Sequence, residues 1–382
     1  MTIPVDRADV IVIGGGGMGS TAAAEIARRG ARVIVLDRFP PPHDRGSSHG
    51  QSRLIRLAYF EHPDYVPLLR AAYRRWRDLE VAAGRALLTE SGLLLAGPSD
   101  GEAVRGTLHA AAVHGLPVEC FTADAGRARY PQILLPPDWL LLHERCGGWL
   151  RVEDCVRAAL DLAVGHGARL ETGVTVVDWR ADGDGVVVET DRGRYAAARL
   201  VIAAGPWAGG LLRLPSIPLV VLRKGLFWFA PRAEHRAGLV AGAFPCFAFD
   251  TAAGFFYGFP AMDGGGVKVA EHSGGAVVED PLTVERGVDP EERARVEEVL
   301  AARLPAALGP LVASATCLYT MSPDGHFILG LHPGNPRVAV AAGFSGHGFK
   351  FASVVGDILA DLALDGRTDL PIGFLAPTRF AG

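Results

Sequence analysis

The feature that most constrains the fold is a glycine turn near the N-terminus. Residues 9–13 are mainly apolar and predict a buried strand, which runs directly into the pattern G-x-G-x-x-G at Gly14, Gly16 and Gly19. A helix rich in small residues follows, and residues 31–38 predict a second apolar strand. Strand, glycine turn, helix and strand in this order predict the first βαβ unit of a Rossmann-type domain.

The predicted βαβ unit has an acidic residue at the end of its second strand. Asp37 lies at the end of the second strand, eighteen residues beyond Gly19, where a carboxylate reaches the ribose of a dinucleotide. Gly14 permits the tight turn, Gly16 lets the backbone approach a pyrophosphate, and Gly19 lets the helix pack on the strand. The N-terminus of the helix favours the same anion through its dipole and free N–H groups. We therefore expect a dinucleotide site, for either a nicotinamide or a flavin.

The chain then departs from the regular alternation of strand and helix that most nicotinamide-dependent dehydrogenases show. We expect helices over residues 65–80 and 151–165, with a strand over residues 90–96 between them. Glycine and aspartate turns next separate three predicted strands, within residues 168–180, 185–193 and 198–205. A strand meander after a Rossmann start is typical of two-domain flavoproteins.

The second half of the chain predicts a different sheet. From about Leu211 to Leu318 the strands are aromatic and alternate with turns, which indicates an antiparallel sheet with a helix over residues 290–304. A strand over residues 338–341 and a helix from Phe349 then return the chain to the first domain. The expected fold class is α/β with α+β character: a Rossmann-type domain and a second, antiparallel-sheet domain.

The composition of the chain argues against some classes of binding partner. The 38 basic and 42 acidic residues leave a net charge of −4, which gives no electrostatic footprint for nucleic acid or an anionic membrane. The N-terminus lacks the pattern of a cleavable leader, and no window reaches eighteen apolar residues, so we expect a cytoplasmic protein. Five scattered cysteines without a C-x-x-C pair predict neither a disulfide framework nor a zinc site, and we expect no metal.

Five motifs carry a resemblance to a known family. They are "GGGGMGS" near the start, "GSSHGQSRLIRLAY" at 46–59, "FYGFP" with "VKVAEH" at 256–272, "TCLYTMSPDGHF" at 316–327 and "AAGFSGHGFKF" at 341–351. In this order the chain resembles the monomeric sarcosine oxidase and N-methyltryptophan oxidase family of amine-oxidising flavoproteins. The resemblance covers nearly the whole chain.

The resemblance implies both an activity and an organisation. The cofactor is FAD, linked covalently through a cysteine, and a secondary amino acid is oxidised to an imine, after which O2 is reduced to H2O2. The FAD-binding domain is expected to comprise residues 1–85, 143–215 and 319–382, and the substrate domain residues 86–142 and 216–318. A monomer that acts on a small amine is expected.

By position, Cys317 matches the residue that links the flavin. Read alone, a cysteine in an apolar strand is a buried small hydrophobe. Thioether formation needs a thiolate, so a cation should lie nearby, and Arg53 matches an arginine close to the flavin. Lys268 matches the lysine that promotes the oxygen reaction, although strand alternation alone would place it in solvent. His272 is expected on the same strand face as Lys268.

Substrate contacts are also implied. Arg56 and Lys350 are expected to bind the carboxylate, because a planar fork suits two-point contact and a lysine at a helix N-terminus needs an anionic partner. Tyr257, Tyr319 and His347 complete the expected substrate site, together with His272. The aromatic residues of the second sheet otherwise form its core.

The cofactor itself is expected to contact a larger set of residues. Glycines at 343, 346 and 348 should let backbone N–H groups approach the flavin, and an apolar side chain at Gly346 or Gly348 would hold the ring away. The expected cofactor-binding residues are Gly14, Gly16, Met18, Gly19, Asp37, Ser48, His49, Arg53, Val174, Gly205, Trp207, Cys317, Gly343, Phe344, Gly346, His347, Gly348, Phe349 and Lys350.

Two other readings stay open. One is a nicotinamide- or quinone-coupled dehydrogenase built on the same first domain. The other is a nucleotide-binding subunit of an amine dehydrogenase complex that passes electrons to another acceptor. Within the oxidase reading, sarcosine, larger N-methyl amino acids and cyclic amino acids such as proline or pipecolate are all candidates. The loop at Arg223, Lys224 and Gly225 matches no motif.

Overall fold

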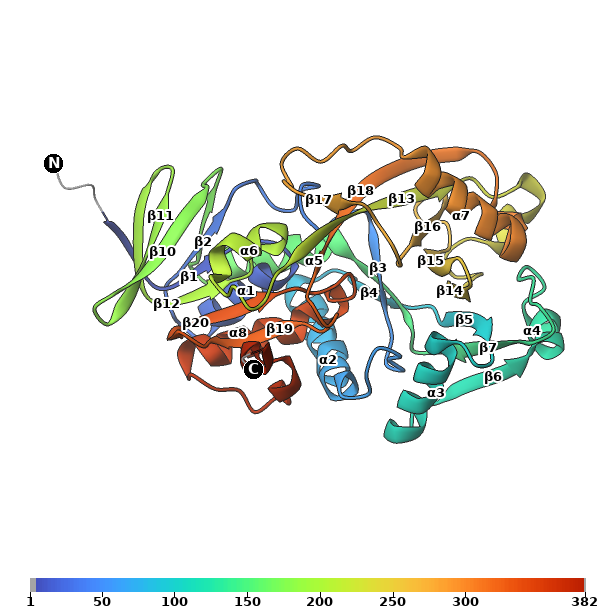
Figure 1. The fold of residues 1–382 in the computed structure, drawn as a ribbon, viewed down its shortest axis with the longest axis horizontal. Coiled ribbons are helices and arrows are strands. Elements are labelled where there is room, and N and C mark those ends of the chain that lie inside the picture. The colour runs from blue at the N-terminus through green and yellow to red at the C-terminus, as the bar shows by residue number, and fades with distance from the viewer. Residues whose placement is uncertain (1–4, 381–382) are drawn as a thin grey trace.

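A computed structural model describes residues 5–380. Its strands form two large sheets, one at each end of the elongated molecule, and a small sheet between them (Figure 1). The first sheet has eight strands and the second has nine. Residues 1–4 and 381–382 of the predicted domain ranges lie outside the described residues. Parallel and antiparallel sheets in one mixed α/β fold confirm the expected fold class.

The predicted βαβ unit lies at the centre of the first sheet. Strand β1 (Val5–Ile13) leads into helix α1 (Gly17–Arg28) and then strand β2 (Val33–Asp37), and β1 and β2 pair in parallel. The helix begins within the glycine turn itself, at Gly17. On its other side β1 pairs in parallel with β12 (Gly193–Ile202).

The predicted three-strand meander is four strands. The expected strand within residues 168–180 is broken at Gly173, which has φ +67° and ends β9 (Arg169–Thr172) before β10 (Val176–Asp182) begins. β9 extends the parallel part of the sheet beyond β2, whereas β10 and β11 (Gly185–Thr190) form an antiparallel hairpin with β12. The prediction of a single strand was wrong because the left-handed backbone at Gly173 ends the first half, and the two halves then pair with different strands, β2 and β11.

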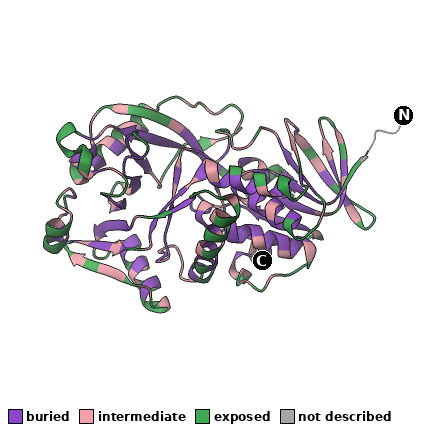
Figure 2. Cartoon of the chain, turned by 180° about the vertical axis from the view of Figure 1, so that it is seen from behind, coloured by how far each residue is buried: buried purple, intermediate pink, exposed green. Residues whose placement is uncertain are grey.

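The C-terminal segment returns to the first sheet, as predicted. β20 (Asn335–Ala342) pairs in parallel with β12 and antiparallel with β19 (Ile328–His332). Helix α8 (Ala352–Leu364) packs against α1, and α1 also packs against α5 (Val152–Gly165). Helix α2 (Tyr65–Ala83) contacts both α5 and α8. Their shared interior is buried (Figure 2).

The second sheet is mostly antiparallel. Its long strands β13 (Val220–Phe229) and β18 (Leu311–Met321) pair along nearly their whole length and run toward the first sheet (Figure 1). The aromatic strands β14 (Cys246–Thr251), β15 (Gly254–Phe259) and β16 (Val267–Glu271) follow, with β17 (Val277–Val278) on the edge of β13. Helix α7 (Pro290–Arg303) begins at the cap Asp289 and packs on this sheet.

An early part of the chain completes that sheet. β5 (Leu93–Pro98) pairs in parallel with β14, and the remaining pairs are antiparallel. The other elements here were not predicted; they are α3 (Glu102–His114), β6 (Val118–Thr122), α4 (Ala123–Arg129) and β7 (Trp139–Glu144).

The predicted strand over residues 90–96 is two strands in different sheets. Gly92, with φ +83°, separates β5 from β4 (Leu88–Glu90). A Cβ at Gly92 would lie 2.7 Å from the His143 ring, so only glycine fits this break. β4 pairs with β8 (Gly148–Arg151), which also pairs with β3 (Ser52–Ile55), and these three strands form the small sheet. Within residues 5–380, no helix is long and apolar enough to cross a membrane.

Candidate active site

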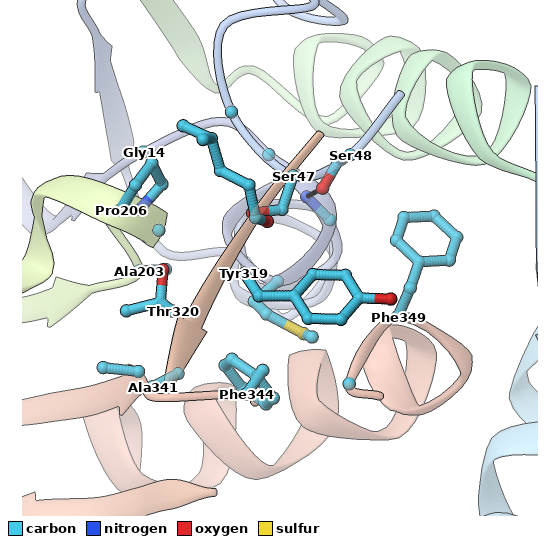
Figure 3. A pocket seen from close by; sticks show the side chains of 18 of the residues that line it. Gly14, Ser47, Ser48, Ala203, Pro206, Tyr319, Thr320, Ala341, Phe344 and Phe349 are labelled. Carbon is cyan, nitrogen blue, oxygen red and sulfur yellow. Dashed lines mark hydrogen bonds between the residues drawn. The ribbon is translucent and has the colours of Figure 1, made fainter. Parts of the chain in front are cut away.

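One large cavity runs from the glycine turn of β1 and α1 to the end of β16. It encloses about 1690 Å³ of space, its opening to solvent included. Separate segments of the chain surround it, as the labelled residues in Figure 3 show. Twenty-one of the predicted site residues line it: Gly14, Gly16, Met18, Asp37, Ser48, Arg53, Arg56, Val174, Gly205, Trp207, Tyr257, His272, Cys317, Tyr319, Gly343, Phe344, Gly346, His347, Gly348, Phe349 and Lys350.

The turn at one end has the geometry that a phosphate site needs. Gly14 has φ +96°, and a Cβ there would lie 2.5 Å from a backbone oxygen of β12's end. A Cβ on Gly19 would lie 1.7 Å from the Gly14 oxygen, so helix and strand meet only with glycine at that position, which is why Gly19 itself does not line the cavity. Gly16 caps α1, and a Cβ there would lie 3.6 Å from the Ser48 hydroxyl, an ordinary van der Waals contact.

Asp37 and Ser48 hold this turn in place. The Asp37 carboxylate accepts the Gly15 N–H at 2.7 Å while facing the cavity, and the Ser48 hydroxyl accepts the Gly17 N–H at 3.1 Å. The carboxylate that is expected to bind the ribose, Asp37, therefore also holds the glycine turn in place.

Several polar atoms in the cavity wall lack a partner among residues 5–380. They are Arg56 Nε, Trp207 Nε1 and Thr320 Oγ1, all buried. Buried polar atoms are normally hydrogen-bonded, so these donors and acceptors fit a ligand with polar groups along its length. Together with the glycine turn, they make the cavity suitable for FAD.

The predicted cation lies beside the predicted thiol. Arg53 Nη2 donates to Cys317 Sγ at 3.1 Å, and its other contacts are the carbonyls of Ser47 and Ser52 at 2.8 and 2.9 Å. Burial raises the pKa of Cys317, but the Arg53 charge together with the contributions of His49 and Lys268 outweighs burial and lowers that pKa to about 6. The thiolate is therefore the main form of Cys317 at neutral pH.

Two predicted residues lie behind the cavity wall. Lys268 is fully buried, so the solvent-facing alternative is wrong, and its Nζ donates to the carbonyls of Gly50 and Ser52 at 2.6 and 2.8 Å. Burial lowers its pKa, and the nearby Arg53 adds to this. His49 is also buried outside the lining. Lys268 and His272 do not act from one strand face: β16 ends at Glu271, and only His272 reaches the cavity.

The glycine-rich segment before α8 packs closely against neighbouring rings. Gly346 has φ +80°, and a Cβ there would lie 2.2 Å from the Tyr319 ring. A Cβ on Gly348 would lie 2.4 Å from the Phe344 ring. The glycines thus let two side chains of the cavity wall pack on the backbone. A short 3-10 turn, Phe349–Phe351, precedes α8.

Arg53 and Arg56 both line the cavity but contact different partners. Arg56 follows β3, and its Nη2 pairs with Glu61 at 2.6 Å. Burial raises the pKa of Glu61, but the charge and hydrogen bond of Arg56 together with the charges of His347 and Lys350 outweigh burial and lower that pKa to about 2. The Arg56 guanidinium also lies over the Phe60 ring, with its carbon 4.5 Å from the centroid. The arginine expected to bind a substrate carboxylate therefore already has a carboxylate partner.

Lys350 has neutral partners instead of the expected anion. Its Nζ donates to the His347 carbonyl at 2.8 Å and to the Tyr59 hydroxyl at 3.3 Å. The Tyr59 hydroxyl lies 2.6 Å from His347 Nδ1, and His347 Nε2 lies 3.0 Å from the Gly325 carbonyl. Only a donor can face that carbonyl, so Nε2 carries the proton and Nδ1 accepts from Tyr59. Burial lowers the pKa of Lys350 to about 7 and that of His347 to about 4.

Two phenols and an imidazole close the far end of the cavity. The Tyr319 hydroxyl lies 3.4 Å from the Tyr257 hydroxyl and 3.3 Å from His272 Nδ1. Burial lowers the pKa of His272 to about 3 and raises the pKa of both phenols, so all three groups are neutral near pH 7. Neutral donors and acceptors suit a neutral amine.

Sequence reasoning missed some residues here. Glu61 and Tyr59 lie in the Arg56 segment, but neither has a spacing signal. Glu61 pairs with Arg56, whereas Tyr59 contacts His347 and Lys350, which are 288 and 291 residues away in the sequence. Ser47, which donates to the Leu318 carbonyl and accepts from Arg53, was inside the quoted motif without a role.

Comparison with known proteins agrees with this site. Residues 9–362 match the family described as DAO, FAD dependent oxidoreductase. The chain is 43% identical to a monomeric sarcosine oxidase of Streptomyces avermitilis over 98% of both chains, and 34% identical to an N-methyl-L-tryptophan oxidase of Escherichia coli O157:H7 over 97% of this chain and 99% of that one. A solved structure of NikD, an unusual amino acid oxidase essential for nikkomycin biosynthesis, covers 98% of both chains with a TM-score of 0.85 and 28% identity. The chain therefore belongs to the DAO family of FAD-dependent oxidoreductases.

Proposed function

We propose that this protein oxidises secondary amino acids, N-methylated or cyclic, to imines and passes the electrons to O2 with release of H2O2. The observation that carries the proposal is the single cavity whose wall includes the Gly14 turn at one end and Arg56 with Lys350 at the other. Relatives whose names specify sarcosine or N-methyl-L-tryptophan oxidation support the substrate class.

FAD, when bound, supplies the acceptor for two electrons of the amine. Gly14, Gly16 and Asp37 would hold its nucleotide part through backbone N–H groups and a carboxylate. Val174, Gly205 and Trp207 would line it from the opposite wall. The 343–350 segment would hold its ring part. Residues of this chain do the rest: they bind the substrate, orient its amine and keep water out.

At the substrate end, Arg56 and Lys350 would bind the carboxylate. Tyr319, Tyr257 and His272 offer neutral oxygen and nitrogen atoms to the amine, and their ring faces offer apolar surface to its methyl group or ring. The aromatic pair Phe60 and Phe255, with ring centroids 5.2 Å apart, bounds the space for the side chain.

Covalent attachment of FAD through Cys317 is part of the proposal. The Arg53 contact supports it, because a thiolate is the nucleophilic form that such a link requires. We also propose that Lys268 assists the reaction with O2: a fixed ammonium would stabilise the negative charge that O2 acquires, and the oxygen acceptors around its Nζ favour the protonated amine.

The two-domain division at the predicted boundaries, the monomeric state and the cytoplasmic location also remain proposals. The two large sheets support the division, since β5, β6 and β7 join the second sheet although they precede α5 in the chain.

A peroxide-release screen tests the proposed function. Purified, flavin-loaded protein is mixed with sarcosine, N-methyltryptophan, proline and pipecolate under air. At least one should give one H2O2 per amine consumed, without any partner protein. Flavin that is reduced by an amine but yields no peroxide would point to a dehydrogenase, and flavin that no secondary amino acid reduces would contradict the proposal.

A further inference from the structure

Lys224 is a buried lysine that the proposed function does not use. It lies on β13, opposite Cys317 on β18, and its exposed fraction is 3%. Its Nζ donates to three consecutive main-chain carbonyls just after β16: His272 at 2.8 Å, Ser273 at 2.7 Å, and Gly274. An ammonium has three N–H donors, so all of them are used within this one loop.

The loop is shaped around the lysine head. Gly274 has φ +63° and Gly275 has φ +112°, and a Cβ on Gly275 would lie 3.2 Å from Lys224 Nζ. Next along the chain, the Ala276 carbonyl accepts the Arg223 N–H at 2.8 Å. The segment after His272 therefore folds back over β13 with the ammonium at its centre.

The two carboxylates near Lys224 each pair with an arginine instead. Glu292 pairs with Arg223, and Glu271 accepts from Arg295 at 2.8 Å. Among residues 5–380, Lys224 forms no salt bridge. Burying an ammonium without a carboxylate is costly unless fixed dipoles replace its water, and the three carbonyl dipoles are what this site provides. The arrangement thus maintains a cation beside the cavity.

Lys224 contacts two residues of the cavity wall, Tyr319 and His272. Its Nζ lies 5.1 Å from the centroid of the Tyr319 ring, and it holds the main-chain carbonyl of His272. The side chains of these two residues meet at 3.3 Å in the cavity wall. A cation on a phenol ring is attracted to its face, so the ring position depends on the ammonium.

From this geometry, and resting on the proposed function, we propose that Lys224 is a positioning residue that sets the His272–Tyr319 pair against the substrate amine. It acts on the orientation of the amine and leaves the carboxylate contact at Arg56 and Lys350 unchanged. Its loss should therefore slow flavin reduction without weakening carboxylate binding.

The test compares Lys224→Met with Arg295→Met in flavin-loaded protein. Arg295 contacts Glu271, next to the same loop, but neither the three carbonyls nor Tyr319, so it controls for local damage. In Lys224→Met the limiting rate constant of anaerobic flavin reduction should fall at least about tenfold, since small misplacements of reacting groups have effects of that size. The Kd of a simple carboxylate inhibitor should stay within about threefold of wild type. Lys224→Gln, which retains two donors, should lose less.

Equal reduction rates in wild type and Lys224→Met would overturn the assignment, as would an equal loss in Arg295→Met. A second readout is independent of activity: the 15N signal of the His272 ring, assigned with His272→Gln, should shift in Lys224→Met and not in Arg295→Met. An unshifted signal would also overturn it. If wild-type flavin is not reduced by any secondary amino acid while the His272 signal shifts as expected, the proposed function fails and the positioning contact stands.

Discussion

At the scale of single residues, Arg56 is paired with Glu61 before any substrate arrives, at a distance of 2.6 Å. A substrate carboxylate must share the guanidinium with Glu61 or replace it. The fork geometry allows either, because an arginine has five N–H donors and Arg56 Nε has no partner among the described residues.

We expect Arg56→Ala to weaken binding of carboxylate inhibitors by at least about thirtyfold, because losing one partner of a desolvated charged contact costs about 2–5 kcal/mol. Glu61→Gln should have the opposite sign and tighten binding, since it frees Arg56 and removes a negative charge. Titration of the flavin absorbance with the inhibitor measures both. Flavin content should stay normal, and unchanged affinity in Arg56→Ala would remove this residue from the carboxylate site.

Lys350 predicts a pH dependence. Burial lowers its pKa to about 7, so the amine is charged below that pH and becomes neutral above it. Binding of a carboxylate inhibitor should weaken as pH rises from 6 to 9, by at most about tenfold per pH unit. Glu61, His272 and His347 do not titrate in this window, since their pKa values are about 2, 3 and 4. Lys350→Met should bind more weakly and with a flat pH profile, whereas a retained slope would assign the titration to another group.

The Arg53 and Cys317 contact predicts a second pH profile. The pKa of Cys317 is about 6, so the thiolate fraction rises between pH 5 and 7 and then levels off. Formation of an acid-stable flavin link, when protein freed of flavin is mixed with FAD, should follow that rise. Arg53→Met should move the rise to higher pH. Flavin that remains entirely acid-extractable at every pH would contradict the link.

At the scale of elements, residues 9–37 show what sequence can predict. Glycine spacing, strand hydrophobicity and Asp37 are all local, and the turn forms as expected. The predictions of single strands over residues 90–96 and 168–180 are wrong for the opposite reason. Each segment is divided at a glycine with positive φ, and its two halves pair with different strands that are distant in the sequence. The ion pair between Arg56 and Glu61 and the loop around Lys224 were also not predicted from the sequence.

Gly346 offers a test of how β18 meets the segment before α8. Gly346→Ala would place a methyl group 2.2 Å from the Tyr319 ring, whereas Gly366→Ala has the same backbone strain and nothing within 4 Å. The first change should therefore lower the free energy of unfolding by about 1–3 kcal/mol more than the second, as overpacking does. Denaturant unfolding of both variants measures the difference. Equal losses would mean that Tyr319 moves aside freely.

At the scale of the whole molecule, the cavity wall joins segments from Ile13 to Lys350. Residues from Gly14 to Phe349 lie around it in Figure 3. A ligand that binds only the folded protein stabilises it by about 2.7 kcal/mol at a hundred times its Kd. For Cys317→Ser, which cannot form the link, the melting temperature should rise with added FAD. Covalently loaded wild type should show no such dependence. If added FAD does not change the melting temperature of Cys317→Ser, the cavity does not bind FAD.

The most direct test of the account is anaerobic reduction of the bound flavin by two matched amines, sarcosine and dimethylamine, which differ by the carboxylate. The absorbance of the oxidised flavin should be lost with sarcosine or with another secondary amino acid, and admission of air should restore it with one H2O2 per flavin. Dimethylamine should reduce the flavin far more slowly. Faster reduction by amines without a carboxylate, or no reduction by any secondary amino acid, would contradict the central claim.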